Sequence, residues 1–257
     1  MTEWSNVTVL KTVGPEKVPW VRIPPLPPSL EIKDKFCLGF AGHSPRARRM
    51  PGESHPFRTM TKYILNSGGL RNKPEKAEKF NKEIIKGLGK KPNILFCFFA
   101  VAREYWEEKF ADYTKRFLES MNEGIKPKFE LAFPDKFVDQ LKNNEAVIIC
   151  GGDDNLLLYW LRQYKLPKIW ENKIVASSSA GSDALVQHFW TCDWRASKDG
   201  LGILPIKFIP HYKSSYGQSN PRGPIDWERA RDELNNYGDK ALPVYALEEG
   251  EYIVIEK

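Results

Sequence analysis

Two short runs in this chain are apolar almost from end to end, and they limit the folds that it can adopt. They are residues 92–100 (PNILFCFFA) and 146–152 (AVIICGG), and a third run at 173–179 (KIVASSS) is apolar only between its lysine and its three serines. A strand that helices cover on both faces shows this continuous pattern, whereas a strand with one solvent face alternates apolar and polar residues. The runs therefore predict buried strands of a mostly parallel sheet.

The segments around these runs show helical patterning. Trp106, Phe110, Tyr113 and Phe117 recur at spacings of four, three and four, which places them on one face of a helix. We expect further helices over "NLLLYWLRQY" and over "AGSDALVQHF", with His188 on the surface of the second. Further strands are expected at 35–42, at 128–133 and in the run before His211. This alternation predicts a three-layer α/β fold with helices on both faces of the sheet.

The N-terminal segment differs in composition from the rest of the chain. Residues 1–30 are rich in proline and end in "VRIPPLPPSL", which favours an extended arm. We therefore expect an arm at 1–30 and a single α/β domain at 31–257. The N-terminus shows no signal-peptide pattern, and no apolar run approaches the roughly 20 residues that span a bilayer, so a cytoplasmic protein without membrane contact is expected.

Charge and cysteine usage exclude several classes of function. The net charge is +6, but basic residues are interspersed with acids, which favours a solvated surface over a nucleic-acid interface. The cluster of Arg46, Arg48 and Arg49 remains a candidate site for an anionic ligand. The four cysteines form no C-x-x-C pair, so we expect buried free thiols and neither a metal site nor a cofactor.

The stretch "VASSSAGSDAL" ends an apolar strand in three serines. In open parallel sheets, ligands bind at the carboxyl ends of the strands. Residues 177–181 match the G-x-S-x-G nucleophile elbow except at the first position, which is Ser177. The pattern therefore presents Ser179 as a nucleophile; the alternative is an ordinary strand-to-helix turn.

A nucleophilic serine needs a base and an orienting acid. His211 follows the apolar run "GILPIKFIP", so it should lie at the same rim as Ser179. Asp193 or Asp199 could be the acid, because both lie between serine and histidine in the chain. Asp183 is four residues into the expected helix and should point away from the site.

These motifs together resemble a known family. "ICGGDDNLLLYWL", "SSSAGSDAL" and "GLGILPIKFIPHY", in this order, are similar to the peptidase E family of serine peptidases, which includes aspartyl dipeptidases and cyanophycinase-like enzymes. The later "VYALEEGEYIVIEK" resembles the family's final strands, which an L-x-E-G turn links. The resemblance is convincing from about residue 91 to 257.

The resemblance implies a fold related to class I glutamine amidotransferases and a cofactor-free hydrolysis of short peptides or amides. Ser179 would be the nucleophile, His211 the base and Asp193 the acid, although Asp199 remains open. Gly152 and the amide of Ala180 would form the oxyanion hole. The residues expected to bind substrate are Gly151, Asp153, Asp154 and Arg229. A homodimer is common among relatives.

Two departures from the family pattern bear on function. The family's G-G-G-N-T turn is Gly151-Gly152-Asp153-Asp154-Asn155 here, which adds carboxylates beside the site. In the T-R-E-x-R segment Asp226 replaces the first arginine and Arg229 matches the second, so strict preference for an aspartyl substrate is not expected. The alternatives are a non-catalytic relative that binds a small ligand and, as a rival fold, an α/β-hydrolase.

Overall fold

The computed structural model describes residues 60–121 and 124–257. The proline-rich arm, the strand expected at 35–42 and the arginines of the cluster at 46–49 lie outside these residues, so the division at residue 30 stays a prediction. Within the described ranges, no helix has the length and apolar character needed to cross a membrane.

The central sheet has six strands in the order β10-β1-β5-β4-β2-β3. Their bounds are β1 Lys62–Asn66, β2 Asn93–Cys97, β3 Lys128–Leu131, β4 Ala146–Ile149, β5 Ile174–Ser178 and β10 Tyr252–Glu256. All neighbouring pairs are parallel except β1 and β10. The three runs predicted to be buried strands form β2, β4 and β5. Two neighbouring pairs between β4 and β5 are buried, Ala146 with Ile174 and Val147 with Val175. The parallel α/β fold is thus confirmed.

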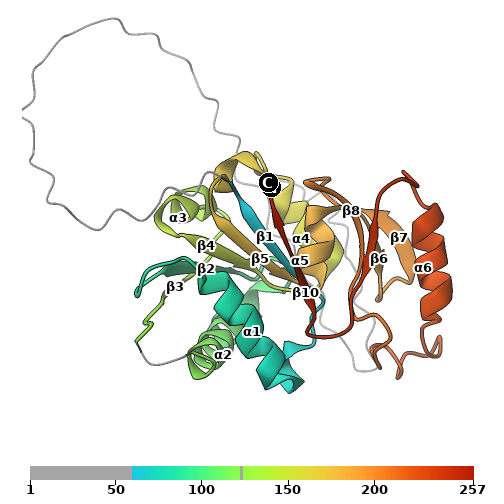
Figure 1. The fold of residues 1–257 in the computed structure, drawn as a ribbon, viewed down its shortest axis with the longest axis horizontal. Coiled ribbons are helices and arrows are strands. Elements are labelled where there is room, and N and C mark those ends of the chain that lie inside the picture. The colour runs from blue at the N-terminus through green and yellow to red at the C-terminus, as the bar shows by residue number, and fades with distance from the viewer. Residues whose placement is uncertain (1–59, 122–123) are drawn as a thin grey trace, which may run out of the picture. The chain divides into compact units, whose positions relative to one another are not determined.

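Helices cover both faces of this sheet, as the alternating pattern predicts. Figure 1 shows α1 (Pro74–Ile85) and α2 (Trp106–Glu119) on one side and α3 (Phe137–Asn143), α4 (Asp154–Leu161) and α5 (Ala180–Leu185) on the other. The direction of travel along the sheet reverses after β3, and right-handed crossovers then require the change of side. In α2 the predicted aromatic face packs on the sheet, where Phe110, Tyr113 and Phe117 surround Phe96.

A second sheet of four strands follows α5 and was not predicted as a separate unit. Its order is β7-β6-β8-β9, with β6 Val186–Thr191, β7 Ala196–Asp199, β8 Leu204–Ile209 and β9 Val244–Ala246. Figure 1 shows α6 (Trp227–Asn236) against this sheet. The helix expected through Phe189 was wrong, because the chain leaves α5 at Leu185 and β6 pairs with β7 and β8. β-branched and aromatic residues favour that strand.

The same correction changes the environment of His188. It lies buried on β6 rather than on a helix surface, with 7% of its surface exposed. Its Nδ1 is 2.7 Å from Oδ1 of Asp199 on the paired strand β7. Asp199 therefore has a partner within the second sheet.

Candidate active site

Ser179 lies on a sharp turn between β5 and α5. Its backbone has φ 51° and ψ −121°, a conformation that is strained for a residue with a side chain. Its N–H donates to the carbonyl of Asn66 on β1 at 3.0 Å, which holds the turn against the sheet. A Cβ on the nearby Gly181 would lie 2.3 Å from the carbonyl oxygen of Ile149, so only glycine fits there. The backbone at Ser179 therefore makes the sharp strand-to-helix turn that a nucleophile elbow requires.

The neighbouring serines stabilise this turn from below. Ser177 is fully buried, and its Oγ is 2.9 Å from Oγ of Ser182 in α5. Ser182 Oγ in turn donates to the carbonyl of Asn66 at 2.9 Å. These bonds link β5, α5 and β1 under the elbow. Serine in place of the first elbow glycine is thus accommodated by hydrogen bonds that glycine could not make.

His211 is held beside Ser179 at the end of β8. Its Nε2 is 3.0 Å from Ser179 Oγ. Its backbone N–H donates to Ser67 Oγ at 2.7 Å, and the Tyr216 ring stacks on the imidazole with centroids 4.4 Å apart. A Cβ on Gly68 would lie 2.6 Å from His211 Cε1, so the chain after β1 also confines the ring.

The carboxylate behind the imidazole is Glu249, not the predicted Asp193. Oε1 of Glu249 is 3.1 Å from His211 Nδ1. Asp193 instead accepts a hydrogen bond from Tyr216 Oη at 2.8 Å, and Asp199 is bonded to His188. Glu249 lies in the loop between β9 and β10, within the quoted L-x-E-G turn, so the sequence held a signal that had been used only to recognise strands.

Backbone pairing explains how Glu249 reaches the histidine. Tyr212 N–H donates to the carbonyl of Leu247 at 2.9 Å, and Gly250 N–H donates to the carbonyl of Gly68 at 2.7 Å. Ser67 Oγ, which accepts from His211 N–H, donates to the same Leu247 carbonyl at 2.8 Å. The loop is therefore tied both to the segment after β1 and to the segment after β8.

Burial lowers the pKa of His211 below its usual value of 6.5, and the hydrogen bond and charge of Glu249 partly oppose that shift. The imidazole is accordingly neutral near neutral pH. A neutral imidazole whose Nδ1–H faces a carboxylate has its Nε2 lone pair free to accept a proton from Ser179. The electrostatics thus suit a general base.

The residues predicted for the oxyanion hole lie beside the nucleophile. Gly152 and Ala180 line the same small cavity as Ser179 and His211. Gly152 has φ 151°, and a Cβ there would lie 2.3 Å from the carbonyl oxygen of Ala100. On Gly151 a Cβ would lie 3.0 Å from Ser179 Cβ, so the glycine pair permits close approach of the turn after β4.

The predicted substrate-binding residues are only partly brought together. Asp154 lines the small cavity. Asp153 is the N-cap of α4, where Oδ1 accepts from Leu156 N–H at 2.9 Å. Arg229 lies exposed on α6, and Asp226 caps that helix by accepting from Arg229 N–H at 3.0 Å. Asp183, expected to point away, is instead buried and lines the cavity.

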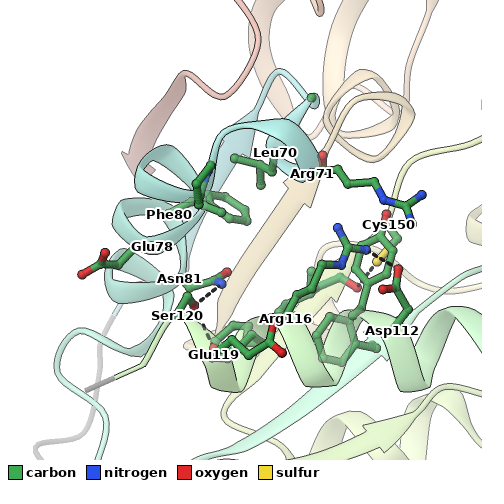
Figure 2. A pocket seen from close by; sticks show the side chains of 18 of the residues that line it. Leu70, Arg71, Glu78, Phe80, Asn81, Asp112, Arg116, Glu119, Ser120 and Cys150 are labelled. Carbon is green, nitrogen blue, oxygen red and sulfur yellow. Dashed lines mark hydrogen bonds and ion pairs between the residues drawn. The ribbon is translucent and has the colours of Figure 1, made fainter. Parts of the chain in front are cut away.

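A larger pocket of about 540 Å³ opens between α1 and α2 at the same rim of the sheet. Ser178 and Gly69, neighbours of the site residues, line it together with Phe96 and Cys150. Figure 2 shows Arg71 and Arg116 extending from its walls toward the end where Cys150 lies. This volume lies in the range of pockets that bind small ligands.

Cysteines and metal ligands add no further chemistry within the described residues. Cys97, Cys150 and Cys192 are buried free thiols, and Cys37 lies outside the described ranges. Burial raises the thiol pKa of Cys150 well above its usual value, so it stays protonated at neutral pH. Over residues 60–121 and 124–257, no group of His, Cys, Asp and Glu side chains is arranged to hold a metal ion.

The chain is similar to known proteins in its fold and in its sequence. A peptidase from an acI-B1 Actinobacterium matches over 77% of this chain and 84% of its own, with 22% identity and a TM-score of 0.52, which confirms a fold of the class I glutamine amidotransferase type. A protein of Listeria monocytogenes EGD-e assigned as a peptidase E covers 77% of this chain and 98% of its own, with 15% identity and a TM-score of 0.49. No curated protein matches the sequence. The model of peptidase family S51 matches residues 63–257, and the chain therefore belongs to that family of serine peptidases.

Proposed function

We propose that the protein hydrolyses short peptides through Ser179, His211 and Glu249. The observation that carries this proposal is the continuous chain of contacts, 3.0 Å from Ser179 Oγ to His211 Nε2 and 3.1 Å from Nδ1 to Glu249 Oε1. It begins at a strained elbow and ends in a carboxylate, which are the parts that serine acyl transfer needs.

In this mechanism Ser179 Oγ attacks the peptide carbonyl carbon while its proton passes to His211 Nε2. The oxyanion that forms accepts hydrogen bonds from the N–H groups of Gly152 and Ala180. His211 then gives the proton to the leaving amine, the C–N bond breaks, and an acyl-enzyme remains. Water attacks the ester carbonyl with His211 again as base, which releases the acid and restores Ser179. Glu249 stabilises the imidazolium in both halves.

The alternative of a non-catalytic relative drew on the missing elbow glycine and on the N-terminal arm, which lies outside the described residues. Ser177 does not obstruct the elbow, because its side chain is buried in hydrogen bonds with Ser182 and with the carbonyl of Ile64 at 3.3 Å. The position therefore supports the turn rather than disabling it. The arrangement favours an active enzyme.

The surroundings favour small substrates without an acidic preference set by α6. The pocket between α1 and α2 offers about 540 Å³ beside Ser178, which suits a few residues of peptide. Asp226 is a carboxylate that caps α6, and Arg229, the cation of this segment, is exposed. This segment therefore supplies no buried cation for an aspartyl side chain. Cytoplasmic location and homodimer formation stay predictions.

The test compares the wild-type chain with Ser179→Ala on a library of dipeptides and short peptides, with products identified by mass spectrometry. We expect cleavage by the wild type and none by Ser179→Ala. Ser215→Ala, which changes an exposed serine in the loop after β8, serves as the matched control and should cleave like the wild type. Equal cleavage by Ser179→Ala would overturn the proposal.

A further inference from the structure

The pocket of about 540 Å³ between α1 and α2 has no part in the proposed mechanism, although one end of it adjoins the nucleophile. Ser178 and Cys150 both line it. The parallel pairing of β5 with β4 sets Ser177 opposite Ile149, so Ser178 and Cys150 lie side by side one residue further along. The pocket therefore begins at the residue next to Ser179.

The chain after β1 connects this pocket with the side of His211 that delivers the proton. A Cβ on Gly68 would lie 2.8 Å from His211 Nε2, and the next residue, Gly69, lines the pocket. In the proposed mechanism the leaving amine takes its proton from Nε2, so it lies on the side of the imidazole that Gly68 covers. A residue that follows the scissile bond is therefore directed toward the pocket.

Three cationic side chains that line the pocket gather at its Cys150 end. Figure 2 shows Arg71 and Arg116 extending toward that end. Burial raises the pKa of the Cys150 thiol, and the charges of Lys109 and Arg116 oppose that rise, so both cations lie within electrostatic reach of the sulfur. Arginine and lysine are the side chains that bind carboxylates by charge-assisted hydrogen bonds. The end of the pocket beside the nucleophile is therefore suited to an anion.

These cations keep donors that are not used within the protein. Arg116 pairs with Asp112 through Nη2 at 2.6 Å, but its Nε is buried and has no hydrogen-bond partner among the described residues. Neither Arg71 nor Lys109 forms an ion pair with an acid in the described ranges. A buried donor without an acceptor is costly, and a bound carboxylate would supply that acceptor.

The other acids that line the pocket do not cancel this charge. Glu78 and Glu119 lie at the opposite end of the pocket (Figure 2). Lys82 pairs with the first of them and Lys115 with the second. Glu75 is exposed on the first turn of α1. The Cys150 end, with three cations and the single acid that pairs with one of them, therefore remains positive.

Apolar side chains form much of the remaining wall. Phe80 of α1 and Phe117 of α2 line the pocket, each 3% exposed, and Phe96 and Ile148 of the sheet line it between the helices. The volume is far larger than a carboxylate group needs, so a side chain has room to enter with it. An apolar wall with one charged end orients an amphipathic ligand. An amino acid with a free carboxylate and an apolar side chain has this character.

We propose that this pocket binds the residue that follows the scissile bond, with its free α-carboxylate at Arg116 and Lys109 and an apolar side chain between α1 and α2. The inference rests on the proposed peptidase function, whose substrate it defines. Only one carbon atom separates the leaving nitrogen from the α-carboxylate of that residue, which fits a charged end beside Ser178. The enzyme accordingly releases an apolar C-terminal residue from a short peptide.

The experiment measures binding to full-length Ser179→Ala, which cannot turn the ligands over. N-acetyl-L-phenylalanine carries the free α-carboxylate, the apolar side chain and an acetyl carbonyl in the place of the scissile one. Its amide lacks the charge, N-acetylglycine lacks the side chain, and N-acetyl-L-isoglutamine carries its carboxylate only on the side chain. By calorimetry we expect N-acetyl-L-phenylalanine to bind at least about tenfold more tightly than its amide, the effect of one charge-assisted hydrogen bond, and more tightly than the other two probes.

Variants of the cations show whether the pocket causes this preference. In the Ser179→Ala background, Arg116→Gln should abolish the preference for the acid over the amide, and Arg116→Lys, which keeps the charge, should retain part of it. Lys142→Gln, an exposed lysine of α3 on the other face of the sheet, is the matched control and should leave the preference unchanged. Folding of each variant is checked by its thermal unfolding transition. If Arg116→Gln is unfolded, Lys109→Gln replaces it, and an unchanged preference in Lys109→Gln overturns the subsite.

Turnover by the wild type gives an independent test. The dipeptide Ala-Phe should be cleaved with a kcat/KM at least about tenfold higher than that of its C-terminal amide. Both substrates leave the same alanyl-enzyme, so the difference arises before the leaving residue departs. A higher kcat/KM for Phe-Ala than for Ala-Phe would place the apolar residue before the scissile bond and overturn the assignment.

The outcomes separate the subsite from the peptidase function. Equal binding of the acid and its amide, or tighter binding of N-acetyl-L-isoglutamine, overturns the subsite. Arg116-dependent binding of N-acetyl-L-phenylalanine supports it even if the wild type cleaves no peptide, in which case the proposed hydrolysis alone fails. Cleavage that is indifferent to the free α-carboxylate overturns the subsite and leaves the peptidase function intact.

Discussion

Replacing Glu249 by glutamine tests the assignment of the acid. The change keeps the shape of the side chain but removes the charge that lies 3.1 Å from His211 Nδ1. At that separation and an effective dielectric constant of about 20, a carboxylate attracts an imidazolium by about 5 kcal/mol. Glu249 is 25% exposed, so solvent reduces this value. We expect the rate constant of nucleophilic attack by Ser179 to fall about 10²–10³-fold, equivalent to about 3–4 kcal/mol.

The assay follows the rate at which an uncharged fluorophosphonate modifies Ser179, so that peptide binding does not enter the result. Asp193→Asn should slow this reaction less than about tenfold, because its carboxylate is bonded to Tyr216 rather than to His211. Glu248→Gln, next in the chain and exposed, is the matched control and should react like the wild type. An Asp193→Asn loss as large as that of Glu249→Gln would refute the assignment.

Two further predictions follow from the geometry of the site. The value of kcat/KM should rise with pH and show an inflection below 6.5, because burial lowers the pKa of His211 and the base must be neutral. In Glu249→Gln the inflection should lie at a still lower pH, because Glu249 raises the pKa of His211. An inflection above 6.5 in the wild type would contradict the reasoning. Gly181→Ala should lower the free energy of unfolding by about 1–3 kcal/mol, since its Cβ would meet the Ile149 carbonyl at 2.3 Å; urea denaturation measures this loss, and unchanged stability would contradict the elbow packing.

The parts of the fold that the sequence predicted are those specified locally. The aromatic spacing of α2 and the continuous apolar runs of β2, β4 and β5 depend on residues close together in the chain. β1 and α1 were not predicted. The helix predicted after Ser179 was too long, since it ran through Phe189 whereas α5 ends at Leu185. The switch from α5 to β6 at Val186 depends on pairing with β8, which a local pattern does not contain.

The site was predicted to a similar extent and for similar reasons. Ser179 and His211 each follow the end of a strand, as predicted, although the two strands belong to different sheets. The acid was sought between these two residues, whereas Glu249 follows both and reaches the imidazole only through the pairing of Tyr212 with Leu247. Asp183 was assigned the wrong direction because the short α5 turns it into the cavity.

The three proposed catalytic side chains come from two different sheets, and this has a consequence for inactivation. Ser179 follows β5 of the central sheet, His211 follows β8 of the second sheet, and Glu249 lies in the strand connection that passes from one sheet to the other. Each of the two contacts is little longer than 3 Å, so a small shift of one sheet relative to the other separates the catalytic groups while the hydrogen bonds within each sheet remain. Catalytic activity therefore depends on how the two sheets are aligned. On gradual heating, turnover should fade before the secondary structure melts, and it should return on cooling.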